Sequence, residues 1–385
     1  MHIDPDHLYE LLEKMLVAHA PPGAETEMDA LVHEIAAPLG DAIWRDAADN
    51  TIVHIKGKSD TQPVAALSHV DEIALIVKRV DADGKIRVRP LGGLHPWALG
   101  ESPVDILARD GLCPGVLSIG AKHVTDESPA GPLKAGQALK WEDMWVETRQ
   151  SAEELARRGI RAGTRVVIAR KHKLLWRMGD CVCGYNLDCR AGLAAIFAAG
   201  RYLRAHQPAQ DVYLIASSSE EIGGHGALYA LAQLPVQTAV AIDIAPAASE
   251  YGTVNNGDPI IPVKDARGLY DGRVIERFES LATAGGFGIQ TAVLSSYASD
   301  ATIAKTSGAI GRAALIGYPG DNTHGYEICA WDGIVNTARL LLALKMRSSA
   351  SALTQHCMHA SNFPSRNRSC ASRTVSIVPL GKCVS

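Results

Sequence analysis

The 385-residue sequence lacks the features that would place the protein in a membrane, on nucleic acid or in the secretory pathway. It contains no run of about 20 uninterrupted apolar residues, so we expect no membrane partner. Its 38 Lys and Arg face 42 Asp and Glu, giving a formal net charge of −4 and no basic excess for nucleic-acid binding. The N-terminus lacks the basic-then-apolar pattern of a signal peptide, which favours a cytoplasmic location.

Cysteine is also scarce, with eight residues in the whole chain, too few for a disulfide-stabilised scaffold of this length. Cys181, Cys183 and Cys189 lie close together, but their spacing fits no standard zinc knuckle, and we interpret them as free thiols. Three further cysteines fall in residues 348–385. This segment is rich in serine and has no Asp or Glu, a composition that predicts a disordered tail.

Hydrophobic residues make up 47% of the chain and charged residues 21%, as in ordinary globular proteins. Strand-like and helix-like segments alternate, which predicts an α/β fold with a mostly parallel sheet and helices on both of its faces. The first helix is expected from Pro5 to about His19, with Asp4 as its N-cap. The expected strands are 51–56, 63–69, 211–217, 238–244, 291–295 and 313–316, and the main later helices are 26–39, 191–203, 226–234, 272–284, 301–307 and 331–346.

Between about Ala74 and Arg170 the pattern changes to short β-like runs separated by Gly, Pro and Asp turns. This texture predicts a small β-barrel or sandwich inserted into the larger domain. We therefore expect a discontinuous catalytic domain formed by residues 1–73 and 171–347, an inserted domain at 74–170, and the tail at 348–385.

Metal-ligand residue types recur where the predicted strands end, the edge at which open α/β sheets bind their ligands. These residues are His69, Asp71, Asp188, Glu220, Glu221, Asp243 and His324. Histidine and carboxylate ligands suit Zn²⁺, Co²⁺ or Mn²⁺, and a carboxylate shared by two ions is the arrangement of two-metal hydrolases. Of the adjacent Glu220 and Glu221, one can bind metal while the other acts as general base and then acid.

Each of these residues also has an ordinary structural explanation. Asp188 alone could cap a helix, a Glu-Glu pair such as Glu220 and Glu221 is usually solvated, and His69 alone could be a core histidine. The metal-site hypothesis therefore depends on the set as a whole.

With these residues and the motifs around them, the sequence also resembles the dinuclear metallo-aminopeptidases of peptidase family M42, which include glutamyl and tetrahedral aminopeptidases. The resemblance covers nearly all of residues 5–346. It rests on Pro22-Gly23-Ala24-Glu25, His69-Val70-Asp71-Glu72-Ile73, Leu187-Asp188-Cys189-Arg190-Ala191-Gly192, Ser219-Glu220-Glu221-Ile222-Gly223, Asp243, Ser299-Asp300-Ala301, and Gly317-Tyr318-Pro319 ahead of His324.

This resemblance implies a role for each residue. Asp188 would bridge two metal ions, His69 and Asp243 would complete one site, and Glu221 with His324 would complete the other. Glu220 would be the catalytic glutamate, and Asp71 would orient the His69 imidazole. The resemblance further implies two divalent ions per subunit, Zn²⁺ or Co²⁺ or else Mn²⁺, and an inserted domain that builds dimers and a hollow dodecamer.

The sequence departs from the family pattern at two places near the expected site. Residues 319–325 read Pro-Gly-Asp-Asn-Thr-His-Gly, which keeps His324 but lacks the Arg and Tyr usual in the family. Directly after the glutamate pair, Gly223-Gly224-His225-Gly226 replaces the segment that is more usual in the family, a small residue followed by x-Arg-Gly. His225 is either a substrate contact or a surface residue. These changes resemble a branch of the family associated with dipeptide-type osmoprotectants.

The sequence therefore predicts a two-metal hydrolase that removes N-terminal residues from short peptides, with Glu220 activating water. One alternative is a dipeptidase or deacylase acting on a capped small amide of the osmolyte type. A further alternative is a non-catalytic assembly protein with a decayed site. A glycosidase is disfavoured, because Glu220 and Glu221 are sequence neighbours rather than a pair flanking a sugar.

Overall fold

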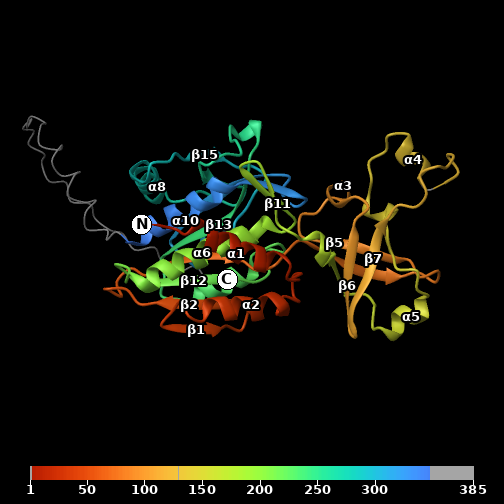
Figure 1. Ribbon diagram of the computed structural model, residues 1–385, viewed down its shortest axis with the longest axis horizontal. Coiled ribbons are helices and arrows are strands. Elements are labelled where there is room, and N and C mark those ends of the chain that lie inside the picture. The colour runs from red at the N-terminus through yellow and green to blue at the C-terminus, as the bar shows by residue number, and fades with distance from the viewer. Residues whose placement is uncertain (1, 129, 347–385) are drawn as a thin grey trace, which may run out of the picture. The chain divides into compact units, whose positions relative to one another are not determined.

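The computed structural model describes residues 2–128 and 130–346, which form a large mixed sheet with its helices and a small barrel (Figure 1). In this part of the chain the large sheet has eleven strands, nine of them in the order β1-β2-β12-β3-β13-β16-β17-β11-β10. Beyond this order, β14 pairs with β15 and β16. The strands are β1 (Ala42–Arg45), β2 (Thr51–Ile55), β3 (Val64–His69), β10 (Trp176–Met178), β11 (Cys181–Gly184), β12 (Val212–Ser217), β13 (Thr238–Pro246), β14 (Ile260–Lys264), β15 (Gln290–Val293), β16 (Arg312–Asp321) and β17 (Glu327–Ala330).

The centre of the sheet consists of four parallel strands, β12, β3, β13 and β16. Their side chains are buried almost throughout, as expected for strands covered on both faces. In the register of these strands, Ser217 lies beside His69 and Asp243 beside Gly317. The C-terminal halves of the central strands therefore bring the predicted ligand residues to one edge.

Helices pack on both faces of this sheet. Helix α6 packs against β3 and β13 together with α1 and α10, whereas α7 and α9 pack against each other and against β12, β13 and β16. A Cβ at Gly192 would overlap the Ser68 hydroxyl, so glycine is required where α6 lies against β3. The helices are α1 (Pro5–Leu16), α2 (Thr26–Ala36), α6 (Leu187–Ala205), α7 (His225–Gln233), α8 (Gly272–Gly285), α9 (Asp300–Thr306) and α10 (Trp331–Met346), with the short η2 (Arg170–His172) and η3 (Ser249–Tyr251).

A closed six-stranded barrel with strand order β4-β5-β8-β7-β6-β9 lies between β3 and β10 in the sequence. It has its own apolar core, which includes Val88, Ile106 and Val146. Its elements are β4 (Ala74–Val80), β5 (Ile86–Leu91), α3 (Pro96–Leu99), β6 (Pro103–Ala108), β7 (Gly111–Ser118), α4 (Gly131–Lys134), η1 (Trp141–Asp143), β8 (Trp145–Glu147), α5 (Ala152–Arg157) and β9 (Arg165–Ile168).

The predicted α/β fold with an inserted barrel is confirmed, and Asp4 caps α1 by accepting bonds from two backbone N–H groups. Two strands run further than predicted. β13 continues past its predicted end at Ile244 to Pro246, and β16 continues past Ile316 to Asp321, because the two strands stay paired through Pro246 and Gly320. On one side of the parallel centre the antiparallel strand β2 was predicted, at 51–56, whereas β1, β11 and β17 were not predicted because they are only four residues long.

The domain boundaries at 73/74 and 170/171 remain predictions. The predicted disordered tail, 348–385, lies outside the described residues.

Within the described residues, none of the helices is both long enough and apolar enough to cross a membrane.

Candidate metal centre

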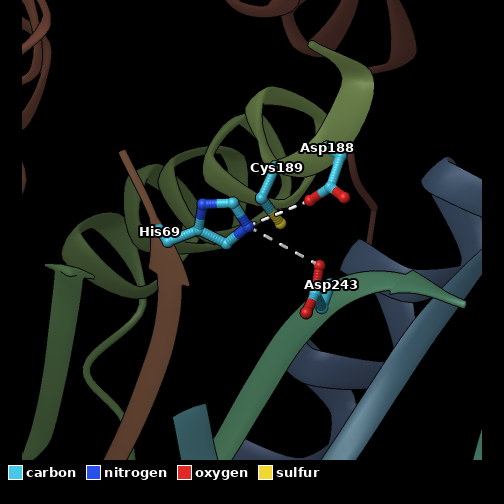
Figure 2. Close-up of side chains that lie close together, drawn as sticks. All are labelled: His69, Asp188, Cys189 and Asp243. Atoms are coloured by element: carbon cyan, nitrogen blue, oxygen red, sulfur yellow. Dashed lines mark hydrogen bonds and ion pairs between the residues drawn. The ribbon is translucent and has the colours of Figure 1, made fainter. Parts of the chain in front are cut away.

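His69 ends β3 and is almost completely buried. Its Nδ1 lies 3.0 Å from the backbone carbonyl oxygen of Asp71, an acceptor that favours a proton on Nδ1. Nε2 is then available as a ligand atom, and it lies 2.9 Å from Oδ1 of Asp188 and 3.9 Å from Oδ1 of Asp243 (Figure 2). The histidine is therefore oriented by the backbone, with Nε2 facing two carboxylates.

His324 is positioned in the same way from the opposite side. Its Nδ1 lies 2.8 Å from the backbone carbonyl oxygen of Gly93, which follows barrel strand β5. Its Nε2 lies 3.5 Å from Oδ2 of Asp188 and 3.7 Å from Oε2 of Glu221. The barrel region thus supplies the acceptor that orients this histidine, a contribution that the sequence pattern did not reveal.

Asp188 lies between the two histidines and presents one carboxylate oxygen to each of them. It stands at the start of α6, where it and Cys189 have non-helical backbone angles before the regular helix begins. Its backbone N–H donates to Glu327 at 3.0 Å. Asp188 is therefore shared by two groups of potential ligands, one with His69 and Asp243 and the other with Glu221 and His324.

Glu220 and Glu221 follow β12, and their backbone is held by Asp71. The buried Asp71 carboxylate accepts hydrogen bonds from the N–H of Glu220 at 3.0 Å and of Glu221 at 3.1 Å. The Nδ1 of His69 lies 3.5 Å from the same carboxylate. The orienting contact on His69 that was expected from the Asp71 side chain is thus shared with the Asp71 backbone, and the side chain also fixes the glutamate turn.

Crowding of buried carboxyl groups changes their acidity. Burial, and then the charge of Asp188, raise the pKa of Asp243 to about 7 and that of Glu221 well above its usual value. Burial likewise raises the pKa of Glu220 well above its usual value. Burial is the largest single effect on Asp188 and would raise its pKa, but the hydrogen bond and charge of His69, together with smaller effects, outweigh burial and keep the pKa low. One charged carboxylate therefore lies among several that favour the protonated form.

These residues fit divalent metal ions. The buried Oε1 of Glu221 has no hydrogen-bond partner among the described residues, an arrangement that is costly unless a cation is nearby. Both histidines turn Nε2 toward carboxylate oxygens of the site, and the two ligand groups combine nitrogen and oxygen donors suited to Zn²⁺, Co²⁺ or Mn²⁺.

Two residues that hold the candidate ligands in place were not predicted from the sequence. Glu327, at the start of β17, accepts bonds from the backbone N–H groups of both His324 and Asp188. The Tyr297 hydroxyl donates to Oδ2 of Asp243 at 2.8 Å. Tyr297 lies far from the other site residues in the sequence and belongs to no local motif. Glu327 lies three residues after His324, and this position of a carboxylate beside a predicted ligand was the only available signal.

Cys189 is a third residue that was not predicted to lie at the site, because the sequence favoured a free thiol with no part in metal binding. It is indeed unpaired, as are the other four described cysteines, but its sulfur faces His69, Asp188 and Asp243 (Figure 2). Burial raises the pKa of this thiol to about 12, so it is protonated in the metal-free protein. By contrast, Cys181 and Cys183 lie in β11 outside this group.

The glycine loop after β5 closes against the same site. A Cβ at Gly92, whose φ is +93°, would lie 3.1 Å from Oε2 of Glu221, so a side chain here would press on the Glu221 carboxylate. His225 is exposed at the start of α7, and its role as a substrate contact remains a prediction.

Two ligand groups that share one aspartate at the carboxyl ends of parallel strands are typical of two-metal hydrolases. A profile of the M42 glutamyl aminopeptidase family matches residues 49–340. The chain therefore belongs to the M42 family of aminopeptidases, which are metal-dependent enzymes.

Individual relatives agree with this assignment. A lysyl aminopeptidase of Pyrococcus furiosus is 30% identical over 241 residues, covering 61% of this chain and 66%, just under two thirds, of the relative. An aminopeptidase from the archaeon Desulfurococcus kamchatkensis has the same fold, with a TM-score of 0.82, 24% identity, and coverage of 93% of this chain and 99% of that one. The TET1 peptidase of Pyrococcus horikoshii, which can assemble into a tetrahedron or an octahedral shell, matches with a TM-score of 0.78, 22% identity, and coverage of 89% and 100%.

Proposed function

We propose that the protein removes N-terminal residues from short peptides at a centre of two divalent metal ions. The observation that carries this proposal is the position of Asp188, whose two carboxylate oxygens face His69 and His324, with Glu220 on the adjoining turn. Family membership supports a peptidase, and the shared carboxylate supports two ions rather than one.

Asp188 is proposed as the bridging ligand, with His69 and Asp243 completing one site and Glu221 and His324 the other. Such ions, when bound, polarise a carbonyl group and make water acidic enough to react near neutral pH. The ligand types admit Zn²⁺, Co²⁺ and Mn²⁺.

Glu220 is proposed as the general base and acid. Its raised pKa suits a carboxylate that takes a proton from the attacking water and returns it to the leaving amine. Asp71 accepts a hydrogen bond from the backbone N–H of Glu220 and so fixes the turn that carries this proposed base.

The barrel is proposed as a self-association domain that builds dimers or larger assemblies. This proposal follows from the likeness to the TET1 peptidase, which assembles into closed shells. Native mass spectrometry of the full chain tests it: a dimer, dodecamer or other defined oligomer is expected, and a monomer at micromolar concentration would contradict it.

The activity is tested with pairs of short peptides that differ only in a free or acetylated N-terminus, assayed on protein loaded with Co²⁺, Zn²⁺ or Mn²⁺. Cleavage of the free forms alone is expected. Cleavage of the acetylated forms instead would point to a deacylase or a dipeptidase for capped amides. Cleavage of neither form with any metal would contradict the proposal.

A further inference from the structure

The thiol of Cys189 lies within one of the two ligand groups of the candidate metal centre. Its Sγ, Nε2 of His69, and a carboxylate oxygen each of Asp188 and Asp243 all lie within 4.8 Å of one another, and all four residues are buried. Figure 2 shows the four side chains converging from β3, β13 and the start of α6. We propose that Cys189 is a fourth protein ligand of the metal ion held by His69, Asp188 and Asp243; this rests on the metal centre proposed above.

The spacing suits a single ion. Bonds of 2.0–2.3 Å to nitrogen, oxygen and sulfur place neighbouring tetrahedral ligands roughly 3.3–3.8 Å apart. In the structure Nε2 of His69 lies 2.9 Å from Asp188 and 3.9 Å from Asp243, and all four ligand atoms lie within 4.8 Å of one another, which brackets this spacing.

The surroundings of the sulfur suit a thiolate ligand. The Ser68 hydroxyl donates to Sγ at 2.9 Å, and the Tyr318 hydroxyl lies 3.4 Å away. The thiol itself donates to the backbone carbonyl oxygen of Ile242 at 3.2 Å. When an ion binds, a metal–sulfur bond replaces the S–H bond, one proton leaves to solvent, and the Ser68 hydroxyl continues to donate to the sulfur.

A fourth ligand would make the two ions unequal. Four protein ligands close a site, as in structural zinc centres, whereas three leave a position open. The group of Asp188, Glu221 and His324 has three ligands, and about a third of the His324 side chain is exposed. The ion beside Cys189 is therefore the tightly held one, and the ion beside His324 is the exchangeable one that faces the substrate. Because thiolate is a soft ligand, the inner site favours Zn²⁺ over Mn²⁺.

The test is the absorption spectrum of the full chain after chelation and addition of one equivalent of Co²⁺. Thiolate coordination gives a near-ultraviolet charge-transfer band that oxygen and nitrogen ligands do not give. We expect this band in the wild type and in Cys183→Ser, a buried cysteine outside the group, and its loss in Cys189→Ser. Loss of the thiolate should also weaken Zn²⁺ binding by about 10- to 100-fold while affecting Mn²⁺ less.

The possible failures are distinct, and none requires an activity assay. Stoichiometric cobalt binding to the wild type without the charge-transfer band would overturn the role of Cys189 and leave the proposed aminopeptidase centre intact. No cobalt binding at all would overturn both. The wild-type spectrum decides the question even if Cys189→Ser does not fold; if it folds, a band that persists in this variant would also overturn the role.

Discussion

The carboxylate of Asp71 accepts a hydrogen bond from the backbone N–H of Glu220 at 3.0 Å. A second bond of 3.1 Å, from Glu221, goes to its other oxygen. One wholly buried side chain therefore fixes the turn that carries both glutamates. This relationship links the end of β3 to the end of β12, and it leads to the first prediction.

Asp71→Asn should lower kcat by about 10- to 100-fold, because an amide has one acceptor oxygen for two backbone N–H groups and turns its own N–H₂ toward one of them. Steady-state kinetics with a free peptide measures the change. Asp211→Asn is the matched control, since Asp211 also contacts a histidine and a backbone N–H, but at the opposite end of β12. Equal losses of kcat in both variants would contradict the positioning role of Asp71.

Glu220→Gln should lower kcat by about 10²- to 10⁴-fold, because it removes the proposed proton carrier without changing the size of the side chain. Metal content, measured by mass spectrometry of the intact holoprotein, should remain unchanged. Glu250→Gln, on the exposed surface of η3, should have no effect. Near-wild-type kcat in Glu220→Gln with metals bound would exclude Glu220 as the general base.

Glu327→Gln should weaken metal binding by about 10- to 100-fold. The reason is that one carboxylate oxygen of Glu327 accepts a hydrogen bond from the backbone N–H of His324 and the other accepts one from the backbone N–H of Asp188. Competition with a fluorescent chelator measures the affinity. The control is Glu154→Gln. Glu154 also accepts a hydrogen bond from a backbone N–H, but it lies in the barrel region, in the first turn of α5. Unchanged affinity in Glu327→Gln would show that the ligands are positioned without it.

The metal-free protein should lose stability as the pH rises from about 4 to about 8. Burial raises the folded-state pKa of Asp243 to about 7 and of Glu327 to about 8, against roughly 4 in an unfolded chain. The folded state then binds more protons than the unfolded state between these values, so the free energy of unfolding falls with pH. Bound cations favour the ionised carboxylates, so the metal-loaded protein should not show this loss.

Thermal unfolding in chelator and in added Zn²⁺, measured at several pH values, checks this prediction. The gap in Tm between the two forms should widen with pH. A constant gap would mean that these carboxyl groups do not titrate as described.

A buried ion pair joins the end of β3 to the chain that returns from the barrel. Lys173 Nζ lies 2.5 Å from Glu72, and both residues are almost completely buried. Lys173→Met should lower the free energy of unfolding by about 3–5 kcal/mol, because Glu72 then remains as a buried charge. Lys173→Met combined with Glu72→Gln should lose less than the sum of the single changes.

Denaturant unfolding measures these free energies. Lys14→Met is the control, because the Lys14–Glu34 pair is largely exposed and should contribute at most about 1 kcal/mol. Equal losses for Lys173→Met and Lys14→Met would contradict the importance of burial.

The long buried elements were predictable from local patterns. β3 and β12 are nearly continuous apolar runs, and α1 has apolar residues at helical spacing with Asp4 as its cap. Short strands such as β11 and β17 have too few residues for a periodic pattern. Their strand conformation depends on pairing with each other and, for β17, with β16.

The sequence by itself determined the kinds of ligand available and their order along the chain, because metal-binding side chains follow the central strands in a recognisable pattern. The tertiary structure alone decided which residues converge. Gly93, Tyr297 and Glu327 support the site from elements far apart in the sequence, and the α6 start turns the Cys189 sulfur toward His69 and Asp243. These contacts arise from strand pairing and from the packing of the barrel region against the sheet edge, and long-range packing leaves no pattern in neighbouring residues.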